Sequence, residues 1–141
     1  MDMKAVRKRL IEHEGLRLDL YQDHLGIWTI GVGRNIQERG ISEETAMQML
    51  DEDIEIVIEE LDERLPEWQN YPVSVREALV DLAFNMGIPR LLTFKRTLAA
   101  LNRQEWGIAA NELLDSRYAK QVGNRAITIS NMIKFCDHNT N

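Results

Sequence analysis

The sequence predicts a single, mostly helical α+β domain with a small β-hairpin near its start. Three observations support this fold class. Apolar and polar residues alternate over residues 16–21, apolar residues recur every three or four positions over residues 46–65, and several shorter helical patterns follow up to residue 135. A chain of 141 residues is long enough to bury one substantial core.

The first elements are a helix and a hairpin. Residues 4–13 have apolar side chains at helical spacing, and Gly15 is expected to end that helix. The alternation over residues 16–21 is typical of a strand, residues 23–26 have the composition of a turn, and β-branched and aromatic residues return over 27–32. We therefore expect two strands joined by a tight turn.

A long helix should follow the hairpin. Ser42 stands before two glutamates, which suits a helix start because the serine oxygen can accept a free backbone N–H and the carboxylates meet the positive end of the helix dipole. The apolar stripe over residues 46–65 predicts one continuous helix that Pro66 ends. A coiled-coil partner could also use this stripe, although the protein's own core is sufficient to explain it.

Shorter helices should make up the rest of the chain. Ser74 is expected to open a helix that ends near Gly87 and Pro89. Further helices are predicted over the following ranges: 94–101, 104–114 and 124–135.

The charge is unevenly distributed along the chain. The net charge is −6, but residues 41–70 carry eleven acidic and one basic residue, whereas the segments on either side are slightly basic. The acidic segment is interpreted as a solvated helix face. No basic stripe supports a nucleic-acid partner.

Several kinds of site and location are disfavoured by composition. The first ten residues are charged and lack an apolar run, so we expect no signal peptide, no stable membrane anchor and a cytoplasmic location. A single cysteine, Cys136, excludes an internal disulfide and suits a reducing compartment. The three histidines, His13, His24 and His138, lack metal-ligand spacing, so neither a metal nor another cofactor is expected.

Three polar residues near the hairpin are candidates for catalysis. Glu14 ends the first helix, Asp23 lies at the turn, and Thr29 lies on the returning strand. A general acid and a second carboxylate or water-positioning group are the usual equipment for breaking a glycosidic bond. Residue types alone also allow both acids to be ordinary surface residues. Gly31 and Gly33 do not complete a phosphate-binding motif and are better explained by a bend or by close packing.

The strings that carry these residues resemble a known family. They are Glu14-Gly15-Leu16-Arg17-Leu18, then Tyr21, Asp23 and Gly26, then Trp28-Thr29-Ile30-Gly31-Val32-Gly33. They closely resemble the catalytic segment of the phage-type lysozymes, glycoside hydrolase family 24, to which the lysozyme of the T-even phages belongs. The similarity continues at Ile41-Ser42-Glu43-Glu44, Ala83-Phe84-Asn85-Met86-Gly87, Trp106, Ser116-Arg117-Tyr118 and Asn124-Arg125-Ala126, so it covers nearly the whole chain.

The resemblance implies a two-lobed arrangement within the single domain of residues 1–141. Residues of about 15–40 would form the small β lobe, and residues 42–65 the connecting helix. Residues 1–14 and 66–141 would together form the helical lobe.

The resemblance also implies a reaction and roles for residues. Glu14 would be the general acid that protonates the leaving sugar oxygen, while Asp23 and Thr29 would hold or activate the attacking water. The family inverts configuration, which requires carboxyl groups separated by roughly 6.5–9.5 Å. Arg125 matches an arginine that the family places beside the catalytic glutamate, where a cation would favour the carboxylate form.

The substrate and its contacts follow from the same resemblance. The expected substrate is bacterial peptidoglycan, cut between N-acetylmuramic acid and N-acetylglucosamine. Its binding residues would be Phe84, Asn85, Thr97, Arg117, Gln121 and Asn124. A phage or prophage would use such a monomeric enzyme for host lysis, with a holin giving it passage from the cytoplasm to the wall.

The chain departs from the family in its small lobe. Only seven residues separate Arg34 from Ser42, where the T-even enzyme has a much longer stretch, and Arg34 itself replaces a histidine. His13 replaces an aspartate beside the catalytic glutamate and could tune its pKa or simply be exposed. These changes leave the catalytic trio intact and put the more distant sugar contacts in doubt.

Two other functions stay open at this point. A lytic transglycosylase would use the same scaffold and form an anhydro sugar without water, although Asp23 and Thr29 favour hydrolysis. A non-catalytic peptidoglycan-binding or structural module would have kept the fold and lost the reaction, which the presence of Glu14, Asp23 and Thr29 disfavours.

Overall fold

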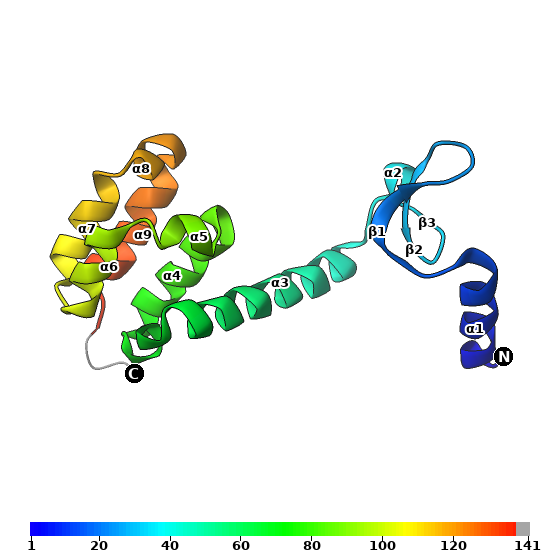
Figure 1. Cartoon of the computed structure of the whole chain (residues 1–141), viewed down its shortest axis with the longest axis horizontal. Helices are drawn as coiled ribbons and strands as arrows, with labels where there is room; N and C mark the ends of the chain where they lie inside the picture. The colour runs from blue at the N-terminus through cyan, green and yellow to red at the C-terminus, as the bar shows by residue number, and fades with distance from the viewer. Residues whose placement is uncertain (138–141) are drawn as a thin grey trace. The chain divides into compact units, whose positions relative to one another are not determined.

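The structure of the protein is a computed structural model that describes residues 1–137. Its chain divides into two compact units, residues 1–49 and residues 50 onward (Figure 1). The helices and the small antiparallel sheet confirm the predicted α+β class. His138, one of the histidines considered above, lies outside the described residues.

The first unit begins with helix α1, Met3–Glu14. Asp2 caps it, because one carboxylate oxygen accepts the backbone N–H groups of Lys4 at 3.0 Å and Ala5 at 3.3 Å. Gly15 ends the helix as predicted, with a φ of +78° that glycine adopts at low cost, and its N–H donates to the Ile11 carbonyl. The expected packing of residues 1–14 with residues 66–141 stays a prediction.

A three-stranded antiparallel sheet follows, in the order β1-β2-β3. Its strands are Arg17–Gln22, Trp28–Gly31 and Arg34–Asn35. Thr29 lies at the centre, paired with Tyr21 on β1 and with Asn35 on β3. The hairpin of β1 and β2 was predicted, whereas β3 was not, because a two-residue strand has no detectable periodicity.

The first unit ends in a short helix and the start of a long one. Helix α2, Ile36–Arg39, was not predicted; the side chain of Asn35 caps it by accepting the N–H of Glu38 at 2.9 Å. Helix α3, Glu43–Arg64, begins and ends where the sequence predicts. The Ser42 hydroxyl oxygen accepts the N–H of Thr45 at 3.1 Å, which confirms Ser42 as the helix cap.

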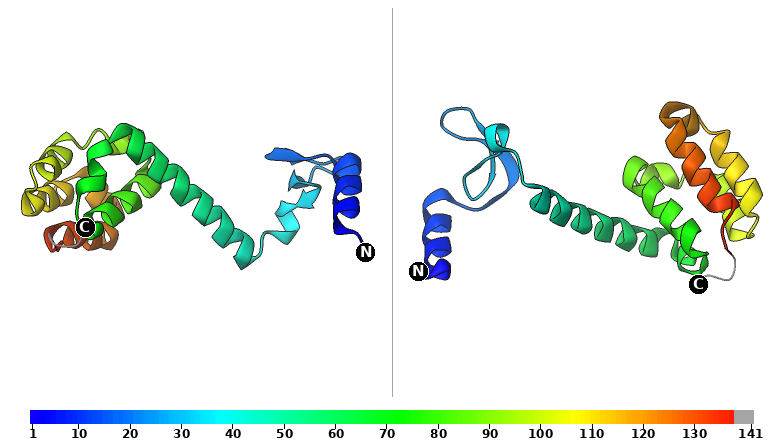
Figure 2. Two further views of the ribbon diagram at one scale, coloured as in Figure 1. Left: turned by 90° about the horizontal axis from the view of Figure 1, so that it is seen from below. Right: turned by 180° about the vertical axis from the view of Figure 1, so that it is seen from behind.

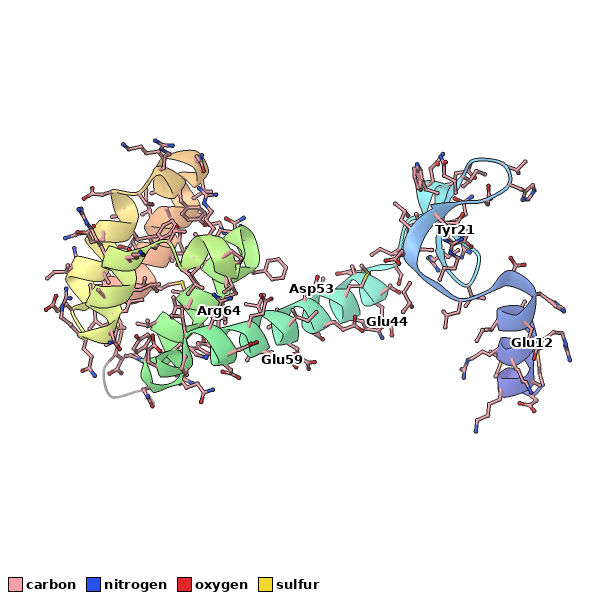
Figure 3. The ribbon with its side chains drawn as sticks, viewed as in Figure 1. Glu12, Tyr21, Glu44, Asp53, Glu59 and Arg64 are labelled. Atoms are coloured by element: carbon pink, nitrogen blue, oxygen red, sulfur yellow. The ribbon has the colours of Figure 1, made fainter. Side chains whose placement is uncertain are left out.

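The acidic segment of α3 is solvated, as predicted. Asp53 and Glu59 are exposed and project from the helix (Figure 3). The apolar stripe reaches the core only near the end of the helix, where Val57 and Leu61 are buried.

The second unit consists of helices. After α3 they are η1 (Pro66–Asn70), α4 (Val73–Met86), α5 (Ile88–Leu91), α6 (Lys95–Asn102), α7 (Trp106–Leu114), α8 (Arg117–Val122) and α9 (Asn124–Lys134). α7 lies against α6 and α9, and α9 lies against α4 (Figure 2). The buried apolar side chains of the described residues all lie between Val57 and Cys136. This unit therefore contains the hydrophobic core.

The starts of α4 and α7 differ from the prediction for identifiable physical reasons. α4 begins at Val73, because Pro72 already occupies the cap position, and the Ser74 hydroxyl instead donates to the carbonyl of Met132 at 2.9 Å. α7 begins at Trp106 because Gln104 has a φ of +59°, which a helix does not allow. The short elements η1, α5 and α8 were not predicted. Among residues 1–137, no helix has both the length and the apolar character that crossing a membrane requires.

Candidate active site

Glu14 is the last residue of α1 and is exposed. Its carboxyl group lies against the turn between β2 and β3: a Cβ built on Gly33 would be 2.7 Å from Glu14 Oε2 and 3.3 Å from Cδ. The structure thus brings the candidate acid directly to the sheet. The close packing expected at the glycines of this segment occurs at Gly33.

Asp23 organises the turn between β1 and β2. One of its carboxylate oxygens, Oδ1, accepts the N–H groups of Leu25 at 2.8 Å and Ile27 at 3.0 Å. The backbone of Asp23 also exchanges hydrogen bonds with the turn: its N–H donates to Ile27 and its carbonyl accepts from Gly26. Because the side chain and backbone both hold the turn, the orientation of the Asp23 carboxylate is set locally.

The same hydrogen bonds keep Asp23 ionised. The N–H of Ile27 lowers the pKa of Asp23 most strongly, partial burial opposes that effect, and the N–H of Leu25 and the charge of His24 lower the pKa further. The net direction is downward from the ordinary value of 3.8. Asp23 is therefore a carboxylate in neutral solution and suits a base or water-holding role, not that of an acid.

Thr29 is the buried centre of the sheet, with only 3% of its surface exposed. Its hydroxyl donates to the carbonyl of Ile27 at 2.8 Å. Asp23 and Thr29 are consequently anchored to the same residue, one through the N–H of Ile27 and the other through its carbonyl. The structure brings these two predicted residues together around one peptide segment.

The sheet connects the three candidates. Asp23 and Thr29 flank the β1–β2 turn, and Glu14 lies against the β2–β3 turn. In the same unit, the guanidinium of Arg17 stacks on the ring of Tyr21, 4.3 Å from the ring centroid. The carboxyl separation that an inverting mechanism requires stays a prediction.

Two of the predicted substrate residues line one cavity of the second unit. Thr97, which is buried, and Arg117, which is exposed, both border a cavity of about 580 Å³. The remaining lining residues include three more cations and two acids, at Arg90, Lys95, Arg96, Glu112 and Asp115. Such a mixture of charges and hydroxyls suits a polar ligand.

Two other predicted residues border a smaller, apolar cavity of about 240 Å³. Phe84, with 44% of its surface exposed, and Arg125 line it together with side chains of α3 and α4. Arg125 binds Asp81 through Nε at 2.8 Å and Nη2 at 2.6 Å. Both partners are about two-fifths exposed, so water screens this ion pair.

The other predicted binding residues have different surroundings. Gln121 accepts a hydrogen bond from Arg90 at 3.0 Å, which connects it to the larger cavity. Asn85 and Asn124 are exposed, and the structure brings them into neither cavity.

Sequence reasoning did not assign the partners that the structure gives to the candidate residues. Ile27 anchors both Asp23 and Thr29, Gly33 receives the Glu14 carboxyl group, and Asp81 binds Arg125. The glycine pattern gave a signal for Gly33. Asp81 had no signal, because 44 positions separate it from Arg125.

The fold and the site together define a class of protein. A helix-borne glutamate beside a sheet that orients an ionised aspartate and a threonine has the residue types that an acid-assisted glycoside hydrolase uses. A comparison with known proteins identifies the family. The sequence profile of the phage lysozyme family matches residues 11–131, so the chain belongs to that family.

Curated relatives agree with this assignment. A protein named probable T4-type lysozyme 1, from Dictyostelium discoideum, is 22% identical over 161 aligned positions that cover 94% of this chain and 95% of the relative. Probable T4-type lysozyme 2 of the same organism is 23% identical over 159 positions, covering 90% and 94% respectively. The chain is a lysozyme-type glycoside hydrolase, and its substrate class is peptidoglycan.

Proposed function

We propose that this enzyme hydrolyses the β-1,4 bond between N-acetylmuramic acid and N-acetylglucosamine and inverts the configuration at the anomeric carbon. The observation that carries the proposal is the shared anchoring of Asp23 and Thr29 on Ile27, in the sheet that also receives Glu14. This anchoring supports the proposal because it holds Asp23 and Thr29 beside each other in the sheet that Glu14 contacts.

Glu14 supplies the proton to the leaving group. In its protonated form, the carboxyl group transfers its proton to the glycosidic oxygen as the bond to the anomeric carbon breaks. The exposure of Glu14 at the end of α1 lets a polymer reach it. Arg125, matched by the resemblance, would stabilise the carboxylate that remains after the transfer.

Asp23 and Thr29 activate the attacking water. Oδ1 of Asp23 is occupied by two backbone N–H groups, which leaves Oδ2 to accept a water proton. Because the Thr29 hydroxyl donates its proton to the Ile27 carbonyl, its oxygen is left to accept a hydrogen bond from that water. The water oxygen bonds to the anomeric carbon on the face opposite the leaving oxygen, and Asp23 takes the released proton.

The second unit supplies contacts to the rest of the polymer. We propose that Thr97, Arg117 and Gln121 contact it at the larger cavity, and that Phe84 contacts a sugar face. Asn85 and Asn124 would add polar contacts to the acetamido groups. The charged and hydroxyl lining of the larger cavity supports this assignment.

The acid role is tested by Glu14→Gln, with Glu12→Gln as the matched control. Both glutamates are exposed on the last turn of α1, and Glu12 projects from the same helix (Figure 3). We expect Glu14→Gln to lower wall clearing by at least about 100-fold, the usual contribution of a general acid, while Glu12→Gln stays within about twofold of wild type. Undiminished activity of Glu14→Gln would refute the assignment.

The products separate hydrolysis from transglycosylation. Hydrolysis adds one water to each new reducing end, whereas a lytic transglycosylase releases an anhydro sugar. Mass spectrometry of the fragments should show the hydrated ends, and NMR taken early in the reaction should show the α-anomer first. Anhydro ends as the main product would overturn the proposal.

The biological setting is also part of the proposal. We propose that the enzyme acts as a monomer in host lysis, that it waits in the host cytoplasm, and that a holin gives it access to the wall. Fractionation of cells expressing the chain with and without a holin tests this. Efficient release of the enzyme without a holin would contradict it.

A further inference from the structure

The carboxyl group of Glu14 lies so close to Gly33 that a side chain at position 33 would not fit beside it. The built Cβ at Gly33 lies 2.7 Å from Oε2 of Glu14 and 3.3 Å from both Cγ and Cδ. Real Cβ atoms essentially never approach another heavy atom within 3.0 Å. Any residue other than glycine at this position therefore displaces the carboxyl group or the turn.

Gly33 differs from Gly31 in the space available for a side chain and not in the sign of its backbone φ angle. Gly31, two residues earlier, also has a positive φ, +72° against +63° for Gly33. A Cβ built on Gly31 meets nothing within 4 Å. The two glycines thus share the conformational requirement, and only Gly33 has the additional requirement of space for Glu14.

Little else in the first unit holds the carboxyl group of Glu14. The backbone of Glu14 is fixed by α1 and its Gly15 cap, but within the described residues of this unit no hydrogen bond or ion pair restrains the carboxylate. The surface of Gly33 is a contact that limits its position on the side of the sheet.

We propose that Gly33 is a positioning residue, whose missing side chain forms the seat of the Glu14 carboxyl group. The proposal rests on the proposed function, in which Glu14 donates the catalytic proton. For ordinary contact, the distance between a Cβ at Gly33 and Oε2 of Glu14 must grow from 2.7 Å to at least 3.4 Å. The carboxyl group therefore shifts by about 0.7 Å. A displacement of about 1 Å in a catalytic group can lower the rate by about 100-fold.

The experiment compares Gly33→Ala with Gly31→Ala on soluble, uncrosslinked peptidoglycan strands. Both substitutions strain a positive φ, so we expect similar falls in melting temperature. Only Gly33→Ala should lower kcat, by about 100-fold, with KM within about twofold of wild type. Equal losses of kcat in the two variants, or a loss that falls on KM, would overturn the proposal.

A second pair covers the case in which alanine prevents folding. Asparagine tolerates positive φ better than alanine and still adds a Cβ. Gly33→Asn should lose kcat by about the same factor as Gly33→Ala, and Gly31→Asn should stay within about threefold of wild type. A folded Gly33→Asn variant that keeps the wild-type kcat would refute the proposal that Gly33 positions the Glu14 carboxyl group.

The Glu14→Gln variant separates this proposal from the proposed function. If Glu14 is the acid and Gly33 its seat, adding Gly33→Ala to Glu14→Gln should cause no further loss beyond about twofold. A fully active Glu14→Gln would sink the proposed function itself. An inactive Glu14→Gln combined with equally impaired Gly33 and Gly31 variants would sink only the positioning role.

Discussion

The Tyr118 side chain offers a test of the energetics of the second unit, because its buried hydroxyl has no hydrogen-bond partner among residues 1–137. The residue is 1% exposed, and burial raises the pKa of its phenol. A buried polar group that lacks a partner costs roughly 1–3 kcal/mol of folding free energy. Tyr118→Phe removes that group and keeps the ring.

The ring contacts should survive the substitution. Phe94 meets the Tyr118 ring edge-on, with centroids 6.3 Å apart, and the guanidinium of Arg90 lies 5.8 Å from the centroid. Neither contact uses the hydroxyl. We therefore expect Tyr118→Phe to raise the free energy of unfolding by about 1–3 kcal/mol, which for a chain of this length raises Tm by roughly 3–9 °C.

Urea unfolding followed by the fluorescence of Trp68 and Trp106 measures this change, since both tryptophans are buried in the second unit. Tyr21→Phe is the control, because Tyr21 is half-buried in the first unit and its substitution should change stability by less than about 0.5 kcal/mol. A loss of stability in Tyr118→Phe would refute the reasoning, because it would mean that the hydroxyl forms a stabilising hydrogen bond.

Two further predictions concern charges. The lowered pKa of Asp23 means that its ionised form stabilises the fold above the ordinary pKa of 3.8 and that this contribution is lost as pH falls through the lowered value. The stability difference between wild type and Asp23→Asn, followed by Trp28 fluorescence in urea, should shrink as the pH falls below about 3.8, and a difference that does not shrink there would contradict this. Asp81→Asn should lower the free energy of unfolding by less than about 1 kcal/mol, because its ion pair with Arg125 is exposed, and the effect should disappear in 1 M salt at a Debye length of about 3 Å. A loss in urea titrations that is larger, or that salt does not change, would show that the pair is not screened as inferred.

The elements that could be predicted depend on signals close together in the sequence. α3 begins at its Ser42 cap and ends before Pro66, and α1 ends at Gly15. The Asp23 turn and the strands beside it were also predictable, because turn residues and alternating side chains act over a few positions. The short elements β3, α2, η1, α5 and α8 were missed because two to six residues contain too little periodicity to read.

In the candidate site, too, the residues with signals close together in the sequence were predictable and the contacts between distant residues were not. Glu14, Asp23 and Thr29 were identified from the sequence, largely through their resemblance to a family, and the oxygen-to-N–H contacts of Asp23 agree with a local turn motif. The ion pair of Arg125 with Asp81 could not be predicted, because α4 and α9 meet only when the core of the second unit forms.

The sequence by itself determined the α+β class, the long helix, the hairpin and the catalytic candidates, because caps, turns and periodic side chains act within a few residues of one another. Only the tertiary structure decided that Ile27 holds both Asp23 and Thr29, and that the Glu14 carboxyl group rests on Gly33. Glu14 and Gly33 meet because the sheet folds back to the end of α1. A contact of that kind depends on backbone geometry and on free space, which residue types alone do not specify.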